Sequence, residues 1–339
     1  MKSFVPLLLA GLLSAAVSVQ AQEPWPNKPV LVISPWAAGG PAEAIIRPIA
    51  EKLSQRLGQQ FVVESRGGAN GTIGAAAVAR ARPDGYTLLF SHVGPIAISP
   101  VLPQKPPYDP IKDFAPITQI ASGPTVLVVR PDFPAKTLVE YLDYAKKNPG
   151  KVSYGSVGPG STTHLAGATI AHMIGTEMIH IPYKGSAPIN NDLLGGNISS
   201  AFVNVAGVMS LIQGGQLRPL AVSTTSRAAL LPNVPAVSET LPGFEVNSWY
   251  GLMAPAGTPP AIVNKLYQEI VQILKLPDIA ARMKDNGLDP EGTSPEQYAA
   301  KIRADLVRWA NSVRTCRWAR IRPVLSRVMP TIAVGMAAR

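Results

Sequence analysis

Short aliphatic runs alternate along most of the chain with segments in which apolar residues recur at helical spacing. The first run is Val30–Ile33, and the segment from Pro41 to Leu57 that follows it carries its apolar residues on one face and stops at Gly58. Side chains alternate across a strand and return to the same face of a helix after three or four residues. Strands and covering helices in this order are typical of a mostly parallel sheet, so the pattern predicts an α/β fold.

The alternation falls into two blocks, followed by a helical end. We expect strands at 30–33, 61–64, 87–90, 126–129, 152–154, 180–181, 201–203, 220–222 and 249–254. Further helices are expected at 72–80, 137–147, 260–275, 279–286 and 295–312. The stretch from 100 to 116 is rich in proline, which has no backbone N–H, and predicts an irregular connection. Crossings near 118–126 and 245–253 would join two lobes through a hinge, and a hinge between lobes implies a cleft.

The N-terminus has the features of an export signal. Lys2 precedes an apolar run from Phe4 to Val19, and Val19-Gln20-Ala21 is a small-residue cleavage site. The run is shorter than the roughly 20 residues that span a bilayer, which argues against the alternative of a membrane anchor. We expect cleavage after Ala21, a signal peptide at 1–21 and a mature protein in the periplasm.

The formal net charge of +10 comes mostly from the two ends of the chain. Lys2 and six arginines after Val313 account for seven of the 31 basic side chains, which leaves 24 against 21 acidic ones between residues 22 and 313. Such a balance is ordinary for a soluble protein, and no basic stripe is interleaved with aromatics. The composition therefore argues against a nucleic-acid partner.

Cysteine and histidine are too sparse for a metal or disulfide framework. The single cysteine, Cys316, has no partner in the chain, and the four histidines are scattered: His92, His164, His172 and His180. A structural zinc site needs closely spaced Cys and His ligands. No metal and no cofactor are therefore expected.

Three glycine-rich turns each join a predicted strand to a helix, around Gly39, Gly71 and Gly158. The first N–H groups of a helix have no partner within the helix, and they attract anions together with the helix dipole. Taken alone, each of these turns is equally explained as a tight turn that needs glycine for its backbone. Three of them on two lobes favour a cleft for a small anion.

The chain has no clear catalytic pattern. The P-loop and dinucleotide fingerprints are missing, and a hydrolase would have to use Ser156 or Ser161 with His164, although no GxSxG elbow surrounds either serine. Trp249 and Tyr250 either line the cleft near the return crossing or sit in the core. We expect no enzymatic activity.

Several stretches in order over 25–313 resemble one family, the extracytoplasmic solute receptors of tripartite tricarboxylate transporters, called Bug-type receptors. The matching motifs are Trp25-Pro26-Asn27-Lys28-Pro29, Val63-Glu64-Ser65-Arg66, Ala69-Asn70-Gly71-Thr72-Ile73-Gly74, Pro83-Asp84-Gly85-Tyr86-Thr87-Leu88, Tyr154-Gly155-Ser156, His164-Leu165-Ala166-Gly167, His180-Ile181-Pro182-Tyr183-Lys184-Gly185, Asp192-Leu193-Leu194-Gly195-Gly196 and Trp249-Tyr250-Gly251-Leu252.

The resemblance implies a type II periplasmic binding fold, whose two lobes close on a small carboxylate and deliver it to membrane transporter subunits. Lobe 1 would comprise 22–122 and 246–313, and lobe 2 would comprise 123–245, in a monomer. The resemblance implies ligand contacts through N–H groups, hydroxyls and waters rather than an arginine. The implied first-lobe residues are Ala37, Ala38, Gly39, Gly40, Ala69, Asn70, Gly71, Thr72, Ser91 and His92. Those of the second lobe are Ser156, Gly158, Ser161, Thr162, His164, Tyr183 and Asn204.

The chain departs from the family pattern at three places. Pro41-Ala42-Glu43 replaces a hydroxyl-acid pair, and Asn204 stands where an aspartate is frequent, so the ligand may differ from the usual ones. The basic tail at 314–339 suggests a frameshifted reading of the gene, or alternatively a genuine extension that contacts a membrane surface. Two other functions stay open on the sequence alone, a periplasmic hydrolase of a carboxylate or ester and a ligand sensor for a signalling receptor.

Overall fold

A computed structural model describes residues 25–36, 41–183 and 185–315 of the 339-residue chain. The predicted signal peptide at 1–21, the candidate residues Ala37 to Gly40, Lys184 and the tail from residue 316 onward lie outside the described residues. No helix within the described ranges is long and apolar enough to cross a membrane.

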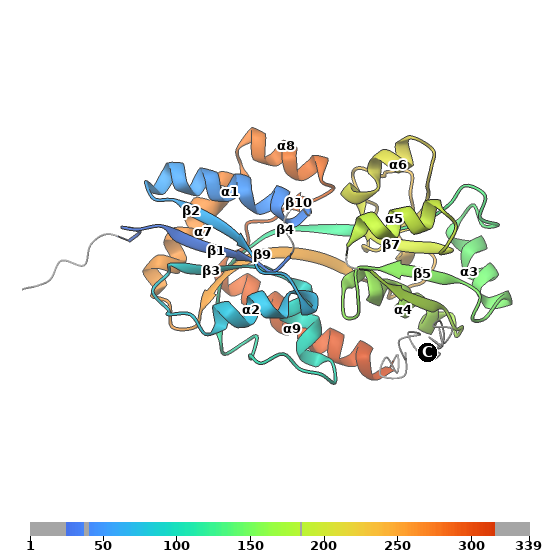
Figure 1. Cartoon of the computed structure of the whole chain (residues 1–339), viewed down its shortest axis with the longest axis horizontal. Helices are drawn as coiled ribbons and strands as arrows, with labels where there is room; N and C mark the ends of the chain where they lie inside the picture. The colour runs from blue at the N-terminus through green and yellow to red at the C-terminus, as the bar shows by residue number, and fades with distance from the viewer. Residues whose placement is uncertain (1–24, 37–40, 184, 316–339) are drawn as a thin grey trace, which may run out of the picture.

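The first lobe is built on a parallel sheet. β1 (Val30–Ser34) lies between β2 (Phe61–Ser65) and β3 (Thr87–His92), and β9 (Asn247–Pro255) runs antiparallel between β3 and the long strand β4 (Phe114–Val129). Figure 1 shows α1 and α8 on one side of this sheet and α2 and α9 on the other. The helices of this lobe are α1 (Pro41–Leu57), α2 (Thr72–Ala79), α7 (Pro260–Leu274), α8 (Pro277–Asp285) and α9 (Pro295–Thr315).

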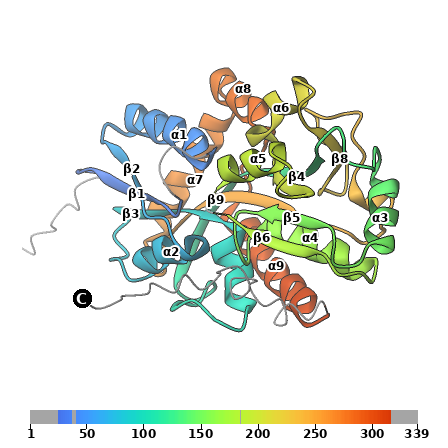
Figure 2. The same ribbon diagram turned by 45° about the vertical axis from the view of Figure 1, so that its right-hand side comes forward.

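The second lobe repeats the arrangement with shorter strands. Its strands are β5 (Ser153–Ser156), β6 (Ile179–Pro182), β7 (Ser200–Asn204) and β8 (Arg218–Val222). β5 runs parallel to β6 and β7, while β7 and β8 run antiparallel to the end of β4. Its helices are α3 (Leu138–Lys147), α4 (Thr162–Met173), α5 (Ser186–Leu194) and α6 (Met209–Gln213). In Figures 1 and 2, α5 and α6 lie above this sheet and α4 below it.

The short elements lie at strand ends and connections. They are η1 (Ala69–Gly71), the single π-helical turn η2 (Gly94–Ile98), η3 (Ser99–Val101), η4 (Val205–Gly207), η5 (Val237–Glu239) and β10 (Asp289–Pro290). β10 pairs with β4, which brings the C-terminal segment back to the middle of the molecule.

The first crossing between the lobes is made by one continuous strand. The chain crosses near 118–126 as predicted, but the strand expected only from residue 126 begins at Phe114, so that β4 is one strand of 16 residues that runs through both lobes. Residues 114–124 pair with β9, and residues 125–129 pair with β7 and β8. Pro116 is tolerated because it lies beside an irregularity in the β4–β9 register, where a missing N–H costs least.

The last helix is anchored to the centre of the sheet by a buried polar contact. Trp249 on β9 is fully buried, and its Nε1 donates a hydrogen bond to Asp305 Oδ2 of α9 at 2.7 Å. Lys301 and Arg308 in turn pair with the same carboxylate, at 3.4 and 2.9 Å. The sequence left two locations open for Trp249, the wall of the cleft and the core, and the structure places it in the core.

The contact between α4 and β5 predicts a position that tolerates no side chain. A Cβ atom on Gly167 of α4 would lie 2.3 Å from the ring of Tyr154. We expect Gly167→Ala to cost about 1–3 kcal/mol of unfolding free energy through overpacking. The melting temperature would fall by several degrees, measured by differential scanning calorimetry.

Gly207→Ala is the matched control, because a Cβ there would meet its nearest neighbour only at 3.6 Å. Equal melting temperatures of the two variants would contradict the close packing of α4 on β5.

Candidate ligand-binding cleft

The turns that leave the strands of the two lobes meet between the lobes. The η1 turn of the first lobe reaches the turn before α4 in the second, where Asn70 Nδ2 donates to the carbonyl oxygen of Gly160 at 2.8 Å. Leu102 of the first lobe is also close, because a Cβ on Gly160 would lie 2.9 Å from its Cδ1 atom. The described structure is therefore closed along this edge, with direct contact between the lobes.

The η1 turn has an unusual backbone. Ala69 and Asn70 both have positive φ angles, 47° and 54°, between Gly68 at 124° and Gly71 at 86°. A non-glycine residue in the left-handed region costs on the order of 1–3 kcal/mol and persists only where its surroundings hold it. Thr72 Oγ1 closes the turn by donating to the carbonyl of Ala69 at 2.9 Å.

His92, at the end of β3, is oriented by hydrogen bonds at both ring nitrogens. Its Nδ1 accepts from the backbone N–H of Gly94 at 3.1 Å, so Nε2 carries the proton and donates to Ser248 Oγ at 2.8 Å. The ring also contacts the edge of Trp36. Burial lowers the pKa of His92 to about 3, which leaves the ring uncharged at neutral pH.

Several candidate side chains have partners inside their own lobe. Ser91 Oγ lies 2.7 Å from the hydroxyl of Tyr298 on α9, and the Tyr183 hydroxyl donates to Asp192 Oδ2 at 2.6 Å. Glu43, the acid at the start of α1, is held by Arg47 at 3.0 Å and by the Ser65 hydroxyl. These groups are engaged in local structure, which the sequence could not show.

Ser161 and His164 form the cap of α4. Ser161 Oγ accepts from the backbone N–H of His164 at 3.2 Å and donates to the carbonyl of Gly158 at 2.6 Å. The ring of His164 uses Nδ1 to accept from the N–H of Gly160 at 3.2 Å. The serine hydroxyl therefore faces backbone groups rather than the imidazole, as a helix cap does and a nucleophile–base pair does not. Thr162, the first residue of α4, is almost fully buried.

His180 is a cleft residue that the sequence reasoning missed. Its ring stacks on His164 with 4.0 Å between centroids, and its Nε2 lies 2.6 Å from Ser156 Oγ. Burial is the main cause that lowers the pKa of both rings, to about 3 for His164, where His180 adds to the shift, and about 4 for His180. The pairing of β5 with β6 brings His180 opposite Tyr154 and two positions from Ser156, on the same face of the sheet. No sequence signal reveals this pairing.

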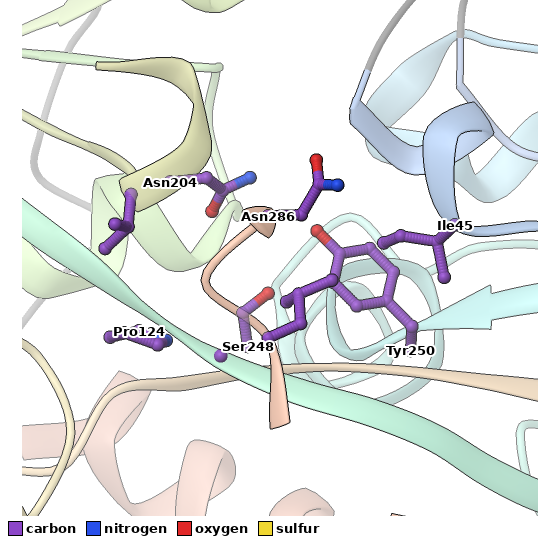
Figure 3. Close-up of a pocket in the computed structure, with 9 residues that line it drawn as sticks. Ile45, Pro124, Asn204, Ser248, Tyr250 and Asn286 are labelled. Atoms are coloured by element: carbon purple, nitrogen blue, oxygen red, sulfur yellow. The ribbon is translucent and has the colours of Figure 1, made fainter. Parts of the chain in front are cut away.

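A small pocket, partly open to solvent and with room for about one water molecule, lies between the lobes beside the hinge (Figure 3). Tyr250 lines it, and its hydroxyl is hydrogen-bonded to Ser248 on the same strand and to Asn204 at the end of β7 in the second lobe. Asn286 lines the same pocket, as Figure 3 shows. Burial raises the pKa of Tyr250 to about 12, so it stays a neutral donor and acceptor. The lining is uncharged throughout: Ile45, Gly123, Pro124, Asn204, Val205, Ser248, Tyr250, Asn286 and Leu288.

The structure thus brings together most of the described candidates. Asn70 contacts the turn at 158–162 directly. The ring of His180 links two other candidates, because it stacks on His164 and is hydrogen-bonded to Ser156. Asn204 of the second lobe is hydrogen-bonded to Tyr250 on β9. Ser248, Asn286 and His180 were not predicted, whereas Ser91 and Tyr183 are directed into their own lobes. The arrangement offers neutral donors and acceptors from both lobes to a small polar molecule.

Comparison with known proteins shows which family has this fold and sequence. A sequence model described as the tripartite tricarboxylate transporter family receptor matches residues 45–316. The chain belongs to this receptor family. The resemblance inferred from the motifs is confirmed, as is the two-lobe α/β fold.

Three relatives illustrate the match. A protein from the tcbD–tcbE intergenic region of Pseudomonas sp. strain P51 is 36% identical over 308 residues, covering 89% of this chain and 91% of its own. A solved structure from R. palustris with adipate has a TM-score of 0.81 at 34% identity, covering 86% of this chain and 98% of its own. The periplasmic binding protein BugD has a TM-score of 0.79 at 36% identity, covering 86% and 99%. Family members are solute receptors rather than enzymes, which confirms the prediction of no catalytic activity.

The buried neutral histidines predict that the protein loses stability in mild acid. An unfolded histidine takes up a proton near pH 6.5, but His92, His164 and His180 in the folded state do so only near pH 3–4. Between these values the unfolded state binds more protons, so the unfolding free energy falls as the pH is lowered. Each histidine contributes a slope of about 1 kcal/mol per pH unit, and its stabilising effect is complete above pH 6.5.

Urea denaturation at several pH values between about 7 and 5.5 measures this slope where the carboxylates of the unfolded chain remain largely ionised. His92→Gln keeps a polar side chain but has no proton to bind, and its slope should be shallower than that of the wild type. Parallel curves for the two proteins would show that His92 is not buried as a neutral ring.

Proposed function

We propose that the mature protein is a periplasmic receptor that captures a small carboxylate between its lobes and delivers it to a tripartite tricarboxylate-type membrane transporter. Membership of the receptor family and the R. palustris relative solved with adipate support this function. The observation that carries it is the meeting of uncharged polar groups from both lobes at one cleft, with Asn70 on Gly160 and Asn204 on Tyr250.

The proposed mode of binding uses dipoles rather than cations. The carboxylate would lie between the first-lobe turn at 69–72 and the second-lobe turn at 156–164, near the first turns of α2 and α4. Contacts from Ala37 to Gly40 remain a prediction from the sequence. Hydrogen bonds to an anion are stronger than those between neutral groups, and they gain more when water is excluded. The ligand would stabilise the closed arrangement because only there do both lobes contact it.

The proposal includes export and organisation. Removal of residues 1–21 would release the receptor into the periplasm as a monomer, with lobe 1 formed by 22–122 and 246–313 and lobe 2 by 123–245. The division of strand pairing within β4 near residue 124 supports this boundary.

A thermal-shift screen of the purified protein against mono-, di- and tricarboxylates, amino acids and neutral amides tests the function. A ligand at about one hundred times its Kd adds about 2.7 kcal/mol to the unfolding free energy, or roughly 5–10 °C for a chain of this size. We expect a carboxylate to give such a shift and to be recovered unchanged by NMR. Consumption of the compound would identify an enzyme, and a panel without any hit would contradict carboxylate capture.

The hydroxyl of Tyr250 provides a test of the cleft itself. Tyr250→Phe removes the bond to Asn204 across the lobes, and we expect affinity for the identified carboxylate to fall roughly 2- to 10-fold, as for loss of one neutral hydrogen bond. Isothermal titration calorimetry measures the change.

Tyr141→Phe is the matched control, because its buried hydroxyl contacts Ser200 at 2.8 Å within the second lobe. Both variants lose one buried hydroxyl, but only Tyr250→Phe should weaken binding. The same affinity in both would place the ligand away from the hinge pocket.

A further inference from the structure

The side chain of Asn70 forms a direct contact between the two lobes that needs no bridging ligand. Its Nδ2 donates to the carbonyl of Gly160 at 2.8 Å, and the same nitrogen lies 3.4 Å from Ser99 Oγ within the first lobe. Part of the contact is buried, so water competes poorly for these groups. We propose that Asn70 is a positioning residue, a latch that closes the empty receptor and thereby sets its affinity. This inference rests on the proposed capture of a ligand by lobe closure.

The first lobe is shaped to present this amide. Asn70 has φ 54° and ψ 34° and follows another left-handed residue, Ala69, which is a costly backbone for side chains other than glycine. Asparagine tolerates this conformation better than most residues. This left-handed turn directs the side-chain amide of Asn70 toward the second lobe, where it donates to Gly160.

Two glycines, one from each lobe, make room for the amide. A Cβ on Gly94 would lie 3.1 Å from Asn70 Nδ2, and a Cβ on Gly160 would lie 3.4 Å from the same atom. Gly94 is fully buried and has no positive φ angle, so its backbone would accept alanine. The amide of Asn70 occupies the space that a side chain at position 94 would need.

The second lobe holds the accepting carbonyl in place. The N–H of Gly160 is bound by His164 Nδ1 at 3.2 Å, and Gly160 itself has a φ angle of 75°. This bond holds the peptide plane on the N-terminal side of Gly160, while the next plane, which carries the Gly160 carbonyl, is held by the N–H of Ser161, which donates to the carbonyl of Gly158 at 3.2 Å. Donor and acceptor are both oriented before the lobes meet, so little conformational freedom is lost when the hydrogen bond forms.

Three variants separate a latch from a merely structural residue. Asn70→Gly removes the amide and suits the left-handed backbone, so it should leave the melting temperature unchanged or raised. Gly94→Ala displaces the amide without altering Asn70. Asn190→Asp is the matched control, because Asn190 Nδ2 donates to the carbonyl of Gly207 at 2.9 Å within the second lobe.

The closed fraction is measured without ligand by pulsed electron paramagnetic resonance on the full chain. Spin labels are placed at Val62→Cys on β2 and Val139→Cys on α3, whose side chains are 50% and 54% exposed, in a Cys316→Ser background. We expect a closed population in the labelled protein that keeps Asn70 and Gly94. The closed-to-open ratio should be roughly 2- to 10-fold lower in Asn70→Gly and in Gly94→Ala. Asn190→Asp should lower the melting temperature and leave the ratio unchanged.

For any ligand found in the thermal-shift screen, the Kd of Asn70→Gly should rise by the same factor, mainly through faster dissociation. An unchanged distance distribution in Asn70→Gly, or the absence of a closed population before mutation, would overturn the latch. Because the distances are measured without ligand, a screen with no hit contradicts the proposed function alone.

Discussion

The two lobes depend on one shared strand. β4 supplies hydrogen bonds to β9 over its first eleven residues and to β7 and β8 over its last five, so neither sheet is complete without it. The partners change between Pro124 and Thr125, next to Gly123. A Cβ on Gly123 would lie 2.5 Å from the side chain of Leu288, which shows how closely the turn between α8 and β10 supports the switch point. Any relative motion of the lobes must therefore be absorbed within a few residues of this strand and the return connection.

The cleft beside this strand is built almost entirely from groups without charge. Burying an ionised side chain without a partner costs far more than burying a hydrogen-bonded neutral one. The three histidines follow this rule, because burial depresses the pKa of each and leaves neutral rings that donate and accept. A cleft lined with charged side chains would bind an anion more strongly. Without ligand, however, like charges on the two lobes would repel each other and opposite charges would pair and hold the cleft shut. Neutral groups allow the same surfaces to meet each other and to meet a ligand.

Periodicity in the sequence predicted most of the secondary structure but not the contacts between elements. β1, β2 and β3 and the helices α1, α7, α8 and α9 were expected close to their observed bounds, because apolar spacing reports which face is buried. The start of β4 was wrong, because prolines suggested an irregular segment up to residue 116, whereas the strand begins at Phe114 and a register irregularity accommodates Pro116. His180 and Ser248 were missed because their partners, Ser156 and His92, are 24 and 156 residues away. Such pairings depend on strand order, which one sequence does not encode in any local pattern.

The energetics of closure explain why neutral contacts suit a receptor of this kind. A ligand shifts an equilibrium only by its differential affinity for the two states, so the empty protein must hold open and closed forms within a few kcal/mol of each other. A neutral hydrogen bond contributes about 0.5–1.5 kcal/mol net, which biases closure without fixing it. A buried ion pair at the same place would bring a large desolvation cost in one state and a strong attraction in the other. With amide contacts such as Asn70 on Gly160, the free-energy difference between open and closed forms stays small enough for one bound carboxylate to shift the protein to the closed form.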